Sequence, residues 1–113
     1  MLNTTVNKIK DRIALCERDV SVLFGFYADK GINLNNLQIY LDTICETKAD
    51  NLIKTYMHEL ETTSLKTELI KYLNSIDAKD KHNGKRFANT LYTKLLNLEQ
   101  EKNLHIEDNK KTI

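Results

Sequence analysis

Apolar residues recur at alternating steps of four and three over residues 2–28. The series comprises Leu2, Val6, Ile9, Ile13, Cys16, Val20, Leu23 and Tyr27. This spacing places all eight side chains on one face of an α-helix. Gly31 then supplies the residue that takes the left-handed conformation just past a helix end. The pattern predicts one long N-terminal helix of about 40 Å, at about 1.5 Å per residue.

The middle of the chain is compatible with either one helix or two. Asn33 or Asn35 is a suitable N-cap, and Leu37 and Leu41 begin a second apolar stripe. The segment 47–50, Thr-Lys-Ala-Asp, resembles a capping box, which predicts a new helix from that point. The apolar spacing nevertheless continues without a break to Leu60. A single helix over residues 35–62 is therefore an equal alternative.

The remaining pattern predicts two further helices, over residues 65–78 and 85–102, separated by an Asn83-Gly84 turn. No segment alternates apolar and polar residues as a strand would. We therefore predict an all-α fold, an elongated four- to five-helix bundle with a long N-terminal helix. It forms a single domain over residues 1–103, and the aperiodic residues 104–113 are expected to be a frayed or disordered tail.

The second half of the N-terminal helix is apolar on every side. No charged residue occurs between Asp19 and Asp29, and Val22 and Phe26 project almost opposite the main stripe. An apolar circumference must be covered on both sides. Either this helix is central in its own bundle or a second chain covers it, most simply a second copy that makes a homodimer. The residues predicted at such an interface are Val22, Phe24, Phe26 and Tyr27, with Leu96 of the last helix as a lesser candidate.

Composition places the chain among ordinary globular proteins. Hydrophobic residues make up 41% and charged residues 29%, and the net charge of +1 excludes a field that steers the whole molecule toward nucleic acid or membrane. The longest apolar run, residues 20–28, is too short to cross a bilayer, and the charged N-terminal segment lacks the apolar core of a signal peptide. We expect a soluble, cytoplasmic protein without membrane contact. The excess of Lys over Arg is typical of AT-rich coding sequences.

A basic segment is the one candidate for contact with phosphate. Seven Lys or Arg and three Asp or Glu lie between residues 66 and 94. Two of the cations would stand at a helix N-terminus, where backbone N–H groups favour an anion. The alternative interpretation is a solvated connection between helices. The residues predicted to contact nucleic acid or phosphate are Lys79, Lys81, Lys85, Arg86 and Lys94.

Catalytic and metal-binding motifs are missing from the sequence. His58 lies on the polar side of its helix and is expected to face water, and His82 and His105 fall in the loop and the tail. Cys16 and Cys45 both occupy apolar stripes, which is typical of buried free thiols in a reducing compartment. We expect no enzymatic activity, no cofactor, no metal and no small-molecule substrate.

These observations favour a small intracellular helical protein that acts by binding another protein. Regulators, adaptors, inhibitors and immunity-type proteins of phages, plasmids and AT-rich bacteria are of this size and class. This hypothesis depends on the size and the all-α class of the chain, and a fold does not by itself imply a function. The alternative is a nucleic-acid-binding module that uses the basic segment and the polar face of the last helix.

Overall fold

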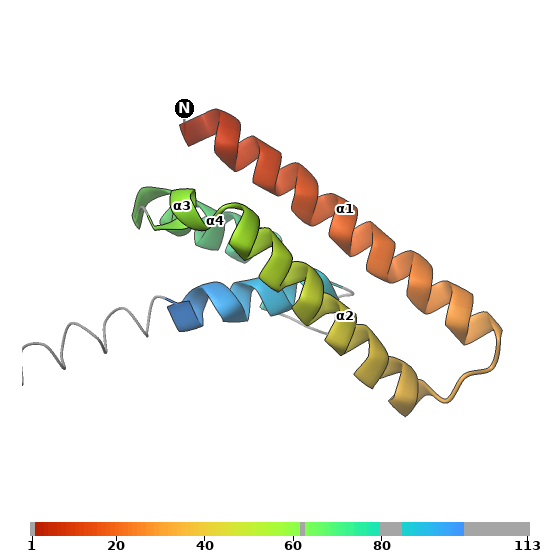
Figure 1. Ribbon diagram of the computed structural model, residues 1–113. Coiled ribbons are helices and arrows are strands. Elements are labelled where there is room, and N and C mark those ends of the chain that lie inside the picture. Colours follow the sequence, from red (N-terminus) through yellow and green to blue (C-terminus); the bar gives the residue numbers. More distant parts are fainter. Residues whose placement is uncertain (1, 62, 80–84, 99–113) are drawn as a thin grey trace, which may run out of the picture.

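The structure is a computed structural model that describes residues 2–61, 63–79 and 85–98. Over these residues it contains five helices and no strand, arranged as an elongated bundle (Figure 1). Four helices carry labels, α1 (Leu2–Asp29), α2 (Leu34–Thr55), α3 (Met57–Leu60) and α4 (Thr63–Ser75). The fifth, over residues 86–98, is called the C-terminal helix below. The predicted fold class is confirmed, and the predicted tail, residues 104–113, lies outside the described residues.

The long N-terminal helix α1 has the predicted face and the predicted end. Val6, Ile9, Ile13 and Val20 are buried. Cys16, Leu23 and Tyr27 of the same stripe are partly buried against the core. After Asp29 the chain turns at Gly31, whose φ of +74° is the left-handed conformation that glycine adopts without strain.

Helix α2 runs through the predicted capping box and ends further on. Asn33 caps its start, with its side-chain oxygen accepting from the backbone N–H of Asn35 at 2.9 Å. The hydroxyl of Thr47 donates to the carbonyl of Thr43 at 3.1 Å, so it sits in the helix interior. The break comes at Tyr56, just after Thr55 donates its hydroxyl to the carbonyl of Asn51 at 2.7 Å. Thr43 and Thr47 make the same kind of bond inside the unbroken helix, so the Thr55 bond accompanies the break and does not by itself explain it.

Helix α4 is slightly offset from the predicted 65–78, since it begins at Thr63 and ends at Ser75. Leu65, Leu69 and Leu73 are fully buried. The chain leaves the helix through Asp77, at φ +56°, and the buried Ala78 donates its N–H to the carbonyl of Leu73 at 2.9 Å. Asp is one of the few residues that tolerate a positive φ.

The C-terminal helix lies along α2 in a parallel register. Arg86 pairs with Asp42 at 3.1 Å and Lys94 pairs with Asp50 at 3.0 Å, and both pairs have the same separation along the chain. The carboxylate of Glu17 in α1 accepts from the backbone N–H groups of Phe87, at 3.4 Å, and Ala88, at 2.8 Å. The C-terminal helix therefore begins level with Glu17 and Asp42 and runs toward the end of α2.

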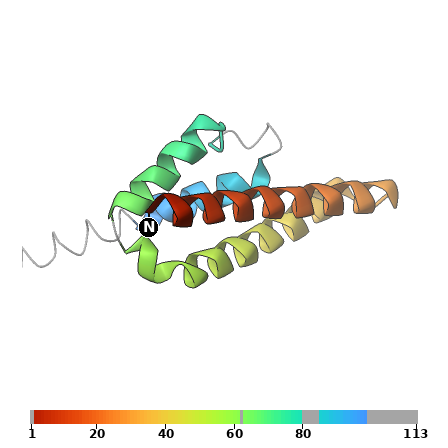
Figure 2. The same ribbon diagram turned by 90° about the horizontal axis from the view of Figure 1, so that it is seen from above.

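This register leaves one end of the α1–α2 hairpin without a neighbour. The core lies where α1, α2, α4 and the C-terminal helix meet, and it is built from aliphatic side chains together with Phe87. Beyond it, the C-terminal half of α1 and the N-terminal half of α2 project from the rest of the bundle (Figures 1 and 2). We call residues 20–40 the hairpin tip.

Candidate protein-binding surface

The hairpin tip carries most of the exposed apolar side chains. Among the described residues, nine large hydrophobic side chains are exposed, and seven of them belong to the tip. These seven are Val22, Phe24, Phe26, Ile32, Leu34, Ile39 and Tyr40. The tip contains only two charged residues, Asp29 and Lys30, which are adjacent and of opposite sign. It is therefore an apolar and nearly neutral surface.

The structure decides between the two explanations for the apolar half of α1. Val22 is 63% exposed, Phe26 is 52% exposed and Phe24 is 40% exposed. The alternative in which the chain's own bundle surrounds this helix is therefore wrong, because α4 and the C-terminal helix do not reach the tip. Contact with a second chain stays a prediction.

Two other predicted interface residues lie differently. Tyr27 is partly buried against the core, so only part of its ring is offered to a partner. Leu96 is half-buried on the C-terminal helix, which runs away from the tip. The structure thus brings together Val22, Phe24, Phe26 and Tyr27 on one projecting element and leaves Leu96 apart.

Three aromatic rings link the two helices of the tip. Phe26 and Tyr27 meet edge to face with ring centroids 5.2 Å apart, and Tyr27 meets Tyr40 of α2 in the same way at 5.5 Å. The Lys30 ammonium lies 4.5 Å from the Phe26 ring centroid. Hydrogen bonding to the Tyr27 side chain raises the pKa of Tyr40. Rings held in this way lose little freedom when a partner binds them, which lowers the entropic cost of association.

Sequence reasoning missed the contribution of α2 to this surface. Ile39 is 66% exposed and Leu34 is 58% exposed, and Tyr40 is also exposed. Sequence reasoning considered only the core stripe of this helix, which passes through Leu37 and Leu41, and did not consider these residues. The signal was nevertheless present, because no charged residue occurs between Lys30 and Asp42 and because Ile39 lies off that stripe.

Two of the four described basic residues predicted to contact phosphate are engaged in ion pairs within the chain. Arg86 and Lys94 are in the ion pairs with α2 described above. Lys85 is half-buried and Lys79 is exposed, while Lys81 lies outside the described residues. The N-terminus of the C-terminal helix, expected to favour an external anion, already holds the carboxylate of Glu17. This arrangement lowers the support for a nucleic-acid surface.

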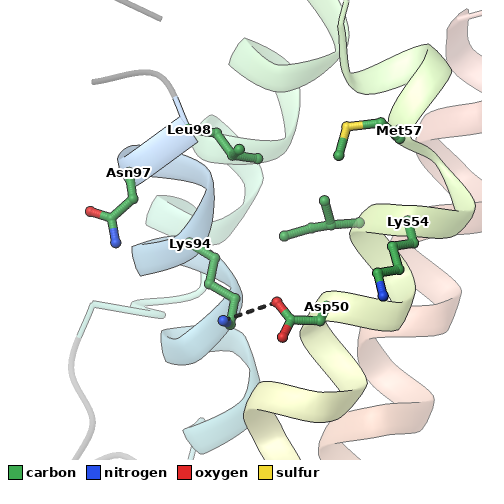
Figure 3. A pocket seen from close by; sticks show the side chains of 7 residues that line it. Asp50, Lys54, Met57, Lys94, Asn97 and Leu98 are labelled. Atoms are coloured by element: carbon green, nitrogen blue, oxygen red, sulfur yellow. Dashed lines mark ion pairs between the residues drawn. The ribbon is translucent and has the colours of Figure 1, made fainter. Parts of the chain in front are cut away.

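An open cleft of about 330 Å³ lies between the end of α2 and the C-terminal helix (Figure 3). Ile53, Met57 and Leu98 give it an apolar lining, and the Asp50–Lys94 ion pair closes one side. The lining contains no histidine or thiol and only one carboxylate, which is already paired.

Both thiols and the described histidine, His58, lie outside this cleft. Cys45 is fully buried, and burial raises its pKa to about 11. Burial also raises the pKa of the half-buried Cys16 against the opposing effect of Lys48. His58 is exposed, as expected. Within residues 2–61, 63–79 and 85–98 no three His, Cys, Asp or Glu side chains are grouped so that they could hold a metal ion.

None of the helices in the described part of the chain has the length and apolar character needed to cross a membrane. The geometry thus leaves the hairpin tip as the candidate functional surface. Comparison of the chain with protein-family models, with curated proteins and with solved structures found no match.

Proposed function

We propose that this protein is a small intracellular regulator or adaptor that acts by binding another protein chain through the hairpin tip. The observation that supports this proposal is the concentration of seven exposed apolar side chains on one projecting element. The largest apolar patch on a typical soluble monomer covers about 300–600 Å² and is often functional.

The chemistry of the tip favours a protein partner over a nucleic acid. Nucleic acids are bound through cations that neutralise phosphates, and Lys30 is the one cation of the tip. Aromatic side chains, by contrast, are enriched at protein interfaces, where charged residues are depleted from the centre. Phe24, Phe26 and Tyr40 fit this composition.

Site-specific photo-crosslinking in the native host tests the proposal. A photoreactive residue is placed at Ile39, which is highly exposed in the tip, and a matched one at Asn74, which is exposed on α4. We expect covalent adducts with a defined protein from position 39 and none from position 74, because only the tip docks. Adducts at neither position, or equally at both, would refute binding through the tip.

A further inference from the structure

The outward side of α1 carries three exposed apolar side chains and a glycine. Leu15, Val22 and Phe26 are spaced by seven and four residues and therefore share one helix face, turned away from the buried stripe. All three are more than half exposed. Gly25 lies beside them, and a Cβ added there would meet nothing within 4 Å. Glycine inside a helix costs about 1 kcal/mol relative to alanine, and no contact with another described residue requires it here.

We infer that this face binds a second copy of the chain, with the two α1 helices antiparallel about a two-fold axis between Leu23 and Phe24. The inference rests on the proposed function and names the partner. In such a pair, a residue of one copy lies level with the residue of the other copy that is equally far from the axis along the helix. The pairs that lie at the same level and on this face of α1 are Val22 with Gly25 and Arg18 with Asp29.

The steric match of the central pair is favourable. At the centre Val22 of each copy faces Gly25 of the other, which has no side chain. Helix axes pack about 8–10 Å apart, depending on the side chains at the contact, and glycine permits the short end of that range. Gly25, unexplained in the single chain, thus becomes the point of closest approach.

The electrostatic match points to a second copy of the same chain. Arg18 and Asp29 are exposed, and neither forms an ion pair with any described residue. The two-fold axis sets Arg18 of each copy opposite Asp29 of the other, so the same ion pair forms twice in the dimer. The tip itself carries one negative and one positive charge, on Asp29 and Lys30. It would therefore not complement a partner with a strongly charged surface.

The apolar part of the contact is formed by Leu15, Val22 and Phe26, which are all more than half exposed on this face. Exposed polar residues beside them, such as Ser21, form the rim. Lys30, which covers one side of the Phe26 ring, stands at the edge of the contact.

Charge reversal tests both the occupant and the register. The full chain is studied by sedimentation velocity over a micromolar concentration series. Arg18→Asp and Asp29→Arg should each weaken the dimer by about tenfold, because each sets like charges opposite one another twice. The double variant should recover most of the affinity. Lys71→Asp, at an exposed position of α4, is the control and should leave the dimer unchanged.

Gly25→Ala provides a second test, in which two measurements move in opposite directions. The variant should raise the Tm measured at low concentration, where the monomer prevails, because alanine favours the helix. It should also weaken the dimer by about tenfold, because the methyl group keeps Val22 of the partner away. Asn7→Ala, exposed at the other end of α1, should raise Tm without affecting the dimer.

The outcomes separate this inference from the proposed function. A chain that stays monomeric throughout the series overturns the second-copy inference. If Ile39 then crosslinks to a different protein, binding through the tip still stands. A dimer that the double charge reversal does not restore, or that tolerates Gly25→Ala, refutes the antiparallel register.

Discussion

Cys45 shows what burial does to a single ionisable group in this core. Its side chain has no exposed surface, and its pKa rises from the ordinary 9.0 to about 11 because the interior disfavours the thiolate. The position was predictable, because Cys45 lies on the apolar stripe of α2. The neighbouring charges that modulate it, Glu17 and Arg86, come from distant segments and could not be predicted from spacing.

The raised pKa of Cys45 predicts a loss of stability in alkaline solution. Between about pH 9 and 11 the unfolded thiol has released its proton while the folded thiol keeps it, so stability falls as pH rises. The expected fall in the free energy of unfolding is roughly 2 kcal/mol over this interval. Urea denaturation at a series of pH values measures it.

The comparison variant is Cys45→Ala, which removes this titration. Its free energy of unfolding should decline less steeply over the same interval, whatever its starting value. Parallel pH profiles for the two proteins would show that Cys45 does not contribute in this way.

At the scale of elements, the hydrophobic pattern predicted α1 well and α2 only in part. The stripe through Val6, Ile9 and Ile13 fixed both the helix and its buried face. The end of α2 was not predictable in the same way, because the apolar spacing continues past Tyr56 and no glycine or proline marks the break. A side-chain hydrogen bond from Thr55 accompanies it, and periodicity does not record such bonds.

The capping of the C-terminal helix by Glu17 was equally invisible in the sequence. Glu17 and Ala88 meet only because the bundle places α1 against that helix. Sequence reasoning therefore left the helix N-terminus open to an external anion. The helix itself was predicted, since Phe87, Ala88, Leu91 and Leu95 are buried as their spacing indicated.

Removal of this cap should destabilise the protein. Glu17→Ala leaves the N–H groups of Phe87 and Ala88 without their acceptor and should lower the free energy of unfolding by about 1–2 kcal/mol. Urea denaturation measures the loss. Glu68→Ala, at an exposed position of α4, is the control and should change stability by less than about 0.5 kcal/mol. An equal effect of the two substitutions would contradict the capping role.

At the scale of the whole molecule, the projecting hairpin tip is the feature that sequence reasoning half predicted. The apolar circumference of α1 indicated that something must cover it. Its exposure in the single chain depends on the register between α2 and the C-terminal helix, in which residues 44 positions apart in the sequence form ion pairs. No local pattern contains that information.

The same arrangement predicts uneven local stability. At low protein concentration, amides of residues 20–29 should exchange with solvent at least about tenfold faster than those of residues 6–16, because neither α4 nor the C-terminal helix covers the former segment and several of its side chains are exposed. Hydrogen exchange followed by mass spectrometry measures both segments in one experiment. Uniform protection along α1 in the monomer would mean that the tip is held more firmly than its surroundings imply.

The parallel course of the C-terminal helix along α2 also has a practical consequence. Leu98 lies near Met57, and the start of α1 lies at that same end of the bundle (Figures 1 and 3). A dye, bead or carrier attached near residue 2 or residue 98 would therefore sit far from residues 20–40. A molecule immobilised in this way would present its hairpin tip to the solution. The number of partner molecules bound at the tip could then be counted directly.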